Sequence, residues 1–212
     1  MNVIRLENVS KSYKGISLFE NVNAIFEKGK IYGITGPNGA GKSVLFKLIC
    51  KFIKPDSGAV YIHPEFMRKG TDFPQQFGII IDRPGYIAGL TGYQNLKRWA
   101  QIQNRISDQD IYSSMKQVGL DPNLKQKMKN YSLGMKQKIA LAQAIMENQQ
   151  ILILDEPFNA LDADSVQKIR TLLKLFKEEG RTILLTSHQQ EDIDILCDTV
   201  FQINQNTLKK IR

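Results

Sequence analysis

The chain has 212 residues, enough for one or two domains and for burial of roughly 70% of the surface that the unfolded chain exposes. A hydrophobic fraction of 42% and a charged fraction of 24% are those of a folded globular protein, which excludes a disordered chain, a collagen-like repeat and a coiled coil. Lysine and arginine outnumber the acidic residues by 29 to 21, and the net charge of +8 favours anionic partners without choosing among nucleotides, nucleic acid and a membrane surface. No apolar stretch approaches the roughly 18 residues that span a bilayer, and no signal peptide is visible, so we expect a soluble chain.

The first 81 residues predict β-strands with a single helix among them. Partial alternation of apolar and polar residues predicts the strands, and apolar residues at helical spacing predict the helix. The turn sequence Pro-Asp-Ser-Gly at residues 55–58 ends that helix. The predicted elements are strands over residues 3–9, 23–27, 31–35, 59–62 and 77–81 and one helix over residues 41–52.

Residues 91–150 show helical patterns throughout. Ser107 with Asp110 three residues later forms a capping box, and Ser132 is expected to cap a helix that runs to about residue 146. Strands and helices then alternate again, with strands over residues 151–154, 182–186 and 199–203 and helices over residues 164–179 and 189–196. The sequence therefore predicts an α/β core that is interrupted by an all-helical insertion of roughly 65 residues.

Some residues are expected to be structural. Cys50 and Cys197 each lie among apolar residues and form no CxxC pair, so buried thiols in a reducing compartment are expected. Further core candidates are Phe46, Phe52 and Trp99.

The sharpest motif is Gly-Pro-Asn-Gly-Ala-Gly-Lys-Ser, which matches G-x-x-x-x-G-K-[ST] between a predicted strand and a predicted helix. Its glycines let successive backbone N–H groups converge on phosphate oxygens, and the following helix adds its positive end. Lys42 would reach the β- and γ-phosphates, and the hydroxyl of Ser43 would ligate Mg²⁺. The motif predicts nucleotide contacts from Gly36, Pro37, Asn38, Gly39, Ala40, Gly41, Lys42 and Ser43.

A second motif supplies acidic groups. The run Ile-Leu-Ile-Leu over residues 151–154 is continuously apolar, as a strand buried on both faces of a sheet is, and it ends in Asp155 and Glu156. Carboxylates at the carboxyl end of a central parallel strand lie where open α/β sheets bind their ligands. Asp155 could bind Mg²⁺ through water, and Glu156 could accept a proton from an attacking water.

These motifs resemble those of the ATP-binding subunits of ABC transporters, and the resemblance covers essentially the whole chain. Residues 131–137 (Tyr-Ser-Leu-Gly-Met-Lys-Gln) look like the family's signature sequence, residues 159–162 (Asn-Ala-Leu-Asp) like its D-loop, and residues 186–188 (Thr-Ser-His) like its switch histidine. Tyr13 stands where the family places an aromatic residue that stacks on adenine. The resemblance implies catalytic roles for Glu156, His188 and Lys42 and further nucleotide contacts from Tyr13, Ser132, Gly134 and Asp162.

Four positions depart from the family's pattern. One is Val44, which replaces the second hydroxyl residue that commonly follows the phosphate-loop serine. Leu133 and Met135 replace a glycine and a glutamine of the signature sequence, and Asp82 stands where the family has a glutamine after a strand. A carboxylate at that place could approach Mg²⁺ or its waters, although it cannot donate hydrogen bonds as an amide does. We therefore count Asp82 with Ser43 and Asp155 as candidates for the metal site. The departures are similar to those of the bacterial bacitracin- and lantibiotic-type subfamily.

The expected fold class is α/β: a P-loop NTPase core with a mixed β-sheet, an N-terminal antiparallel β region and an inserted all-helical subdomain. We expect residues 1–212 to form a single ABC-type ATPase domain. Its core lobe would comprise residues 1–83 and 150–212, and its helical lobe about 84–149.

The resemblance implies a subunit that binds and hydrolyses ATP with Mg²⁺ and powers a separate transmembrane permease by ATP-driven dimer closure. Its partners would be a second copy or a homologous ATPase subunit, and the permease, which would hold it at the cytoplasmic face of the cell membrane. The coupling surface is expected around residues 82–93. No specific nucleic acid is expected, because the basic cluster at residues 125–138 is typical of a solvated helical face.

Two alternatives stay open. One is a soluble ATPase of the same superfamily that acts on nucleic acid or in translation, which the net charge of +8 allows. The other is a nucleotide-binding regulatory subunit with weak hydrolysis, which Asp82 and Leu133 keep open.

Overall fold

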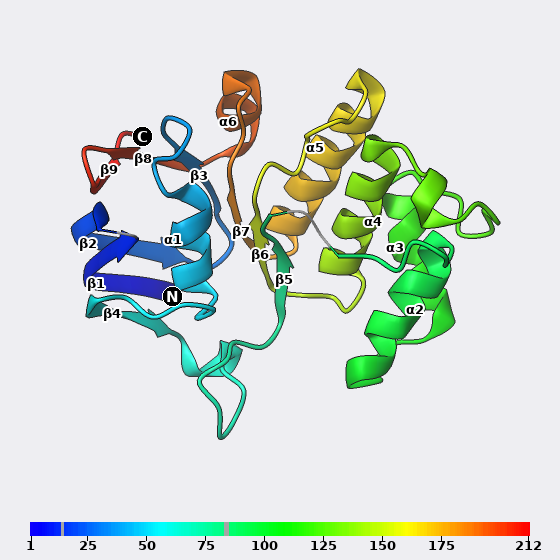
Figure 1. The fold of residues 1–212 in the computed structure, drawn as a ribbon, viewed down its shortest axis with the longest axis horizontal. Coiled ribbons are helices and arrows are strands. Elements are labelled where there is room, and N and C mark those ends of the chain that lie inside the picture. Colours follow the sequence, from blue (N-terminus) through cyan, green and yellow to red (C-terminus); the bar gives the residue numbers. More distant parts are fainter. Residues whose placement is uncertain (14, 83–84) are drawn as a thin grey trace.

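The computed structural model describes residues 1–13, 15–82 and 85–212 and contains two β-sheets with helices around them (Figure 1). A three-stranded antiparallel sheet has the order β2-β1-β4, and a six-stranded sheet has the order β5-β6-β7-β3-β8-β9. In the larger sheet, β5, β6, β7, β3 and β8 pair in parallel in that order, and β9 pairs antiparallel with β8. The strands are β1 (Asn2–Tyr13), β2 (Ile16–Glu27), β3 (Ile31–Thr35), β4 (Ser57–Ile62), β5 (Phe77–Ile80), β6 (Ile151–Leu154), β7 (Thr182–Leu185), β8 (Thr199–Asn204) and β9 (Thr207–Lys210).

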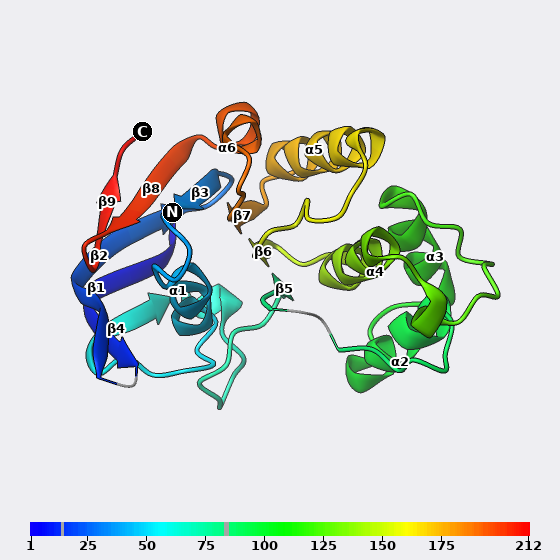
Figure 2. The same ribbon diagram turned by 45° about the horizontal axis from the view of Figure 1, so that its top comes forward.

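Some helices pack beside the sheets, and others lie together at one end of the molecule. They are α1 (Lys42–Ile49), α2 (Gly92–Gln103), α3 (Asp108–Gln117), α4 (Leu133–Ile145), α5 (Ala163–Glu178) and α6 (Gln190–Leu196), with short 3₁₀ helices at Pro64–Phe66 and Met128–Asn130. Helices α2, α3 and α4 lie together at the end opposite the antiparallel sheet (Figure 2). Along the described part of the sequence between β5 and β6, the chain forms helices and loops and no named strand. In the described part of the chain, no helix is long and apolar enough to cross a membrane.

Two apolar cores cover the two faces of the larger sheet. On β6, Ile151 and Ile153 point into a core shared with α1 and the antiparallel sheet. Leu152 and Leu154 point into the other core, which includes residues of α2 to α5. The continuous apolar run is therefore buried on both faces, as predicted, and this burial fixes the strand that ends at Asp155.

Most predicted elements are confirmed, with shifted ends. The capping box of Ser107 and Asp110 is present at the start of α3, and Ser132 caps α4. Both thiols are buried, and burial raises the pKa of Cys50 and of Cys197 to about 12. The expected boundary between lobes, at residues 83 and 84, lies outside the described residues.

Three sequence predictions are wrong. Phe52 is 53% exposed rather than in the core, because α1 ends at Ile49 and the chain turns at Lys51, whose φ is +57°. Residues 118–132 are mostly loop rather than helix, and Pro122 lies in that loop because it cannot donate the backbone bond of a helix interior. Lysines at positions 125 and 127 consequently lie on this loop and not on a helical face.

Strand β9 was not predicted. It contains a single apolar residue, Leu208, so it shows no alternation. It pairs with β8 through a tight hairpin in which Gln205 and Asn206 both have positive φ, at 46° and 60°, as a two-residue type I′ turn requires.

Candidate active site

The glycine-rich motif forms the loop between β3 and the start of α1. Gly36 and Gly41 adopt φ values of 146° and 97°, which disfavour any other residue. A Cβ atom at Gly36 would lie 2.8 Å from the carbonyl oxygen of Ile203, and one at Gly41 would lie 2.9 Å from the ring of Phe19. The loop is thereby pressed against β8 and β2, and its backbone leads directly into the N-terminus of α1.

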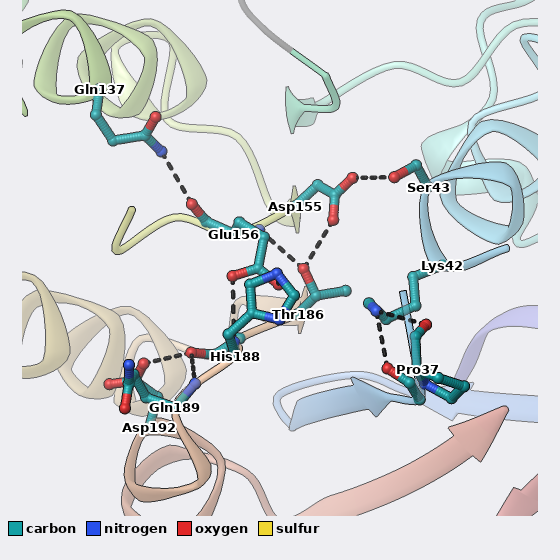
Figure 3. Close-up of polar contacts among 12 residues, drawn as sticks. Pro37, Lys42, Ser43, Gln137, Asp155, Glu156, Thr186, His188, Gln189 and Asp192 are labelled. Carbon is teal, nitrogen blue, oxygen red and sulfur yellow. Dashed lines mark hydrogen bonds and ion pairs between the residues drawn. The ribbon is translucent and has the colours of Figure 1, made fainter. Parts of the chain in front are cut away.

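Lys42 and Ser43 begin α1 and point to different partners (Figure 3). The ammonium group of Lys42 donates to the carbonyl oxygens of Gly36 at 2.9 Å and Pro37 at 3.2 Å, so it lies over the loop. The hydroxyl of Ser43 donates to the carboxylate of Asp155 at the end of β6. A hydroxyl and a carboxylate in contact are oxygen donors of the kind that Mg²⁺ prefers, so this pair fits the predicted metal.

Thr186 joins the ends of β6 and β7. Its side chain is fully buried, and its hydroxyl donates to Oδ1 of Asp155 at 2.7 Å. The hydroxyl oxygen of Thr186 also accepts a hydrogen bond from the backbone N–H of Glu156 at 2.8 Å. One hydroxyl therefore orients both predicted acidic residues from the neighbouring strand (Figure 3).

Glu156 combines burial with an unused acceptor. Its side chain is 16% exposed, and its Oε2 atom accepts a hydrogen bond from the backbone N–H of His188 at 3.2 Å. Its Oε1 atom lies 3.4 Å from Nε2 of His188, yet it is the one buried side-chain polar atom in the described residues that has no hydrogen-bond partner. Burial raises the pKa of Glu156, and the nearby imidazole and backbone amide of His188 partly oppose that rise. Such a carboxylate is suited to accept a proton.

A cavity of about 480 Å³ unites most of the predicted site. It is lined by part of the phosphate loop, Asp155, Glu156, His188 and Tyr13. The ring of Tyr13, at the end of β1, is 62% exposed and is thus accessible at the edge of this cavity. The lining residues come from β1 and β2 and from the segments that follow β3, β6 and β7, so the structure brings these predicted residues together.

Six predicted nucleotide contacts do not line this cavity: Gly36, Pro37 and Ala40 of the phosphate loop, and the three residues outside that loop, Ser132, Gly134 and Asp162. Ser132 is exposed and accepts a hydrogen bond from the backbone N–H of Met135 at 3.1 Å, which caps α4. A Cβ atom at Gly134 would lie 2.5 Å from the carbonyl oxygen of Ala160, so a glycine is needed where α4 meets the 159–162 loop. Asp162 caps α5 through the N–H of Ser165 at 2.8 Å. Within one copy of the chain, Ser132, Gly134 and Asp162 therefore each have a structural role.

Asp82 is placed apart from the other metal candidates. Its carboxylate forms an ion pair with Lys47 of α1 at 2.6 Å. Asp82 does line a neighbouring cavity of about 550 Å³ together with Asp155 and Glu156. A metal role for Asp82 would require its side chain to leave Lys47.

Thr186 and Gln137 were not assigned roles from the sequence. Thr186 follows a buried strand as Asp155 does, and that parallel position is the signal that could have identified it. Gln137 on α4 donates to backbone carbonyl oxygens beside Glu156, and no local pattern predicts that contact.

A phosphate loop between a parallel strand and a helix, with acidic residues at the end of a neighbouring strand, defines a P-loop nucleotide-binding protein. Comparison with known proteins narrows this class. The model of the ABC transporter family matches residues 19–159, which is more than half of the chain. The chain therefore belongs to the ABC transporter family, as an ATP-binding cassette with the ATPase fold of that family.

Relatives of known description agree with this membership. The chain is 38% identical to YybJ of Bacillus subtilis (strain 168), described as an uncharacterized ABC transporter ATP-binding protein, over 98% of this chain and 95% of the relative. It is 35% identical to BcrA of Enterococcus faecalis, a bacitracin transport ATP-binding protein, over 97% of this chain and 68% of the relative. It is 34% identical to SrtF of Streptococcus pyogenes, a lantibiotic transport ATP-binding protein, over 93% of this chain and 85% of the relative. The resemblance to the bacitracin and lantibiotic group is thus confirmed.

The fold is also that of solved ATP-binding cassettes. A dimeric structure of the cassette MJ0796, in a post-hydrolysis state with ADP and Pi, matches with a TM-score of 0.86 at 26% sequence identity over 99% of both chains. A nucleotide-free cassette from an ABC transporter matches with a TM-score of 0.79 at 20% identity over 100% of this chain and 92% of the other, which shows the shared fold. The predicted fold class is confirmed.

Proposed function

We propose that this ABC ATPase binds ATP with Mg²⁺, closes into a dimer around two ATP molecules and thereby drives a separate membrane permease. The adenine would stack on Tyr13 at the edge of the 480 Å³ cavity, and the phosphates would lie on the loop of residues 36–43. Lys42 would turn from the carbonyl oxygens of the loop toward the β- and γ-phosphates.

Ser43 and Asp155 would hold the metal, because they already lie in contact at the carboxyl end of the sheet. Bound there, Mg²⁺ would neutralise charge on the phosphate oxygens. Thr186 would keep the Asp155 carboxylate oriented toward Ser43 through its hydrogen bond to Oδ1.

Glu156 would act as the general base, and the observation that carries this role is its buried Oε1 atom without a hydrogen-bond partner. A water beside the γ-phosphate could donate to that atom, which would satisfy the acceptor and direct the water's oxygen at phosphorus. His188 would hold the other oxygen through its backbone N–H and present its imidazole to the phosphate.

Dimer closure would complete each site with Ser132 and Gly134 of the second subunit. Both residues lie at the N-terminus of α4, away from the cavity of their own chain, and an exposed helix N-terminus favours phosphate. Asp162 would lie at the same interface. The dimeric state of the similar cassette MJ0796 supports this arrangement.

The permease would bind at a groove of about 740 Å³ beside β5 and α2. Large apolar side chains line it and remain accessible, with Ile102 79% exposed, Ile87 48% and Tyr86 38%. The groove includes part of the segment 82–93 that the sequence proposes as the coupling surface. Docking there would hold the chain at the cytoplasmic face of the membrane, as the transport names of its relatives suggest.

The deciding experiment uses Glu156→Gln in the full chain. Without nucleotide we expect a monomer by size-exclusion with light scattering, and with ATP and Mg²⁺ a long-lived dimer and no phosphate release, because ATP binding favours the closed form and hydrolysis cannot reopen it. Lys42→Ala is the control and should stay monomeric with ATP. Wild-type hydrolysis by Glu156→Gln would remove Glu156 from its role, whereas a monomer that binds ATP without hydrolysing it would contradict closure by the chain alone.

The permease part of the proposal has its own test. The test asks whether the adjacent reading frame encodes a membrane protein that co-purifies with this chain; Ile102→Glu should then abolish the association while ATP hydrolysis by the purified chain persists. Unchanged association of Ile102→Glu would place the permease elsewhere on the surface.

A further inference from the structure

A side chain on α4 forms hydrogen bonds to the backbone at Glu156, the proposed general base. The amide Nε2 of Gln137 donates to the carbonyl oxygen of Glu156 at 3.3 Å (Figure 3). It also donates to the carbonyl oxygen of Pro157 at 3.1 Å. Gln137 is half-buried on α4, five residues after the cap Ser132, and lines the 550 Å³ cavity beside Asp155 and Glu156. A side-chain amide therefore joins α4, which begins within the signature-like sequence, to the loop after β6 that contains Glu156 and Pro157 (the Glu156 loop) of the same chain.

The Glu156 loop needs such support because its backbone is strained. Glu156 has a φ of +52°, in the left-handed region that a residue with a Cβ atom adopts only when its surroundings impose it. Pro157 follows and has no N–H with which to anchor the turn. The chain here depends on neighbouring elements to keep its conformation.

The N–H group, the carbonyl oxygen and the carboxylate of Glu156 each form a hydrogen bond to a different residue. The hydroxyl of Thr186 accepts from its N–H group, Gln137 donates to its carbonyl oxygen, and the N–H of His188 donates to Oε2 of its carboxylate. These contacts together leave Oε1 buried and without a hydrogen-bond partner in the described structure. If the Gln137 amide is removed, the carbonyl side of Glu156 loses its fixed point and the carboxylate can turn away from the cavity.

We propose that Gln137 is a positioning residue for ATP hydrolysis, which acts by holding the Glu156–Pro157 backbone so that Oε1 faces the attacking water. This inference rests on the proposed role of Glu156 as the base. Gln137 lies outside the cavity that holds the phosphate loop and Tyr13, so it should affect the chemical step and not ATP binding.

The test compares Gln137→Met with the matched control Gln101→Met, at an exposed glutamine on α2. Methionine keeps the length of the side chain and suits a helix but has no N–H donor. In the purified full chain with ATP and Mg²⁺, we expect Gln137→Met to lower kcat on the order of 10- to 100-fold, as a misplacement of about 1 Å can. The KM for ATP and the equilibrium affinity should change less than about twofold, and Gln101→Met should match the wild type.

A double-mutant cycle separates positioning of the base from general loosening of the loop. If Gln137 acts through Glu156, adding Gln137→Met to Glu156→Gln should lower the residual rate less than about twofold further, measured by single-turnover release of labelled phosphate. An equal loss in both backgrounds would overturn the inference, as would a wild-type kcat for Gln137→Met or a loss confined to KM.

A second variant keeps the inference testable if Gln137→Met fails to fold, which a thermal unfolding measurement would reveal. Gln137→Glu keeps the size of the side chain, and its ionised carboxylate would face two carbonyl oxygens, so kcat should fall at least as far with KM retained. Wild-type kcat in this variant would equally overturn the inference. An active Glu156→Gln would instead refute the base itself, and an inactive Glu156→Gln beside a fully active Gln137→Met would refute the positioning role alone.

Discussion

Thr186 holds Asp155 by a hydrogen bond of 2.7 Å from its hydroxyl to Oδ1, across the ends of two neighbouring parallel strands. The same hydroxyl accepts the N–H of Glu156 at 2.8 Å, so the two acidic residues of the site share one buried point of attachment. The proposed metal-binding carboxylate and the proposed base are thereby kept at a fixed spacing by β7.

Thr186→Val should impair both the site and the fold. Valine keeps the shape of threonine but leaves the N–H of Glu156 unpaired, which costs about 1–3 kcal/mol of unfolding free energy. The loss of orientation at Asp155 and Glu156 should lower kcat on the order of 10-fold or more. Chemical denaturation and phosphate release would measure the two effects.

Thr182→Val is the control for this variant. Thr182 is also buried on β7, but its hydroxyl accepts from the N–H of Gly29 at 3.0 Å, far along the strand from the acids. It should lose stability with little change in kcat. Equal kcat losses in both variants would mean that Thr186 acts only through the stability of the strand.

The raised pKa of Glu156 predicts how stability depends on pH. Burial raises it above the ordinary value of 4.5, so the protonated form is favoured by folding. Its contribution is fully present below the unfolded pKa and is lost as the pH rises through the folded pKa. Glu156→Gln, which resembles the protonated form, should therefore melt at a higher temperature than the wild type at pH 8, with a smaller difference at pH 4.

The same titration should appear in catalysis. Because the base must be ionised, wild-type kcat should fall as the pH drops through the raised pKa of Glu156. Thermal melts and ATPase profiles over pH 4 to 8 would check both expectations. A melting difference independent of pH would show that the Glu156 carboxylate does not titrate differently in the folded chain.

Lys42→Ala should abolish most hydrolysis. The residue begins α1, its ammonium group lies over the loop carbonyl oxygens, and we propose that it contacts the phosphates, so its loss should lower the rate on the order of 10²–10³-fold or more. Lys54→Ala, at an exposed lysine beyond α1, is the control and should keep the wild-type rate. Retained turnover in Lys42→Ala would contradict the phosphate-loop assignment.

Tyr13→Ala should weaken nucleotide binding by about 10-fold, the typical effect of removing an aromatic side chain that stacks on a nucleobase. Stacking distinguishes purines poorly, so the affinity for GTP should fall with that for ATP. Equilibrium titration with both nucleotides would measure this, with Tyr61→Ala on the antiparallel sheet as the control. An unchanged ATP affinity would remove Tyr13 from the site.

The sequence alone predicted the parts of the site that local patterns encode. The loop of residues 36–43 is recognisable because its glycines permit φ values that other residues avoid, and the buried strand before Asp155 because four consecutive apolar residues require burial on both faces. Ser132 and Ser107 were recognised as helix caps for the same reason: a cap depends on a hydrogen bond within three residues.

Only the tertiary structure decided which side chains meet. Thr186 lies 31 residues from Asp155 in sequence, and Gln137 lies 19 residues from Glu156. Their contacts depend on the order of β6 and β7 in the sheet and on how α4 packs beside them. Asp82 likewise meets Lys47 of α1 rather than Asp155. Burial of apolar faces throughout the core sets these positions. The local sequence around a residue therefore does not predict a contact partner that lies far away in the chain.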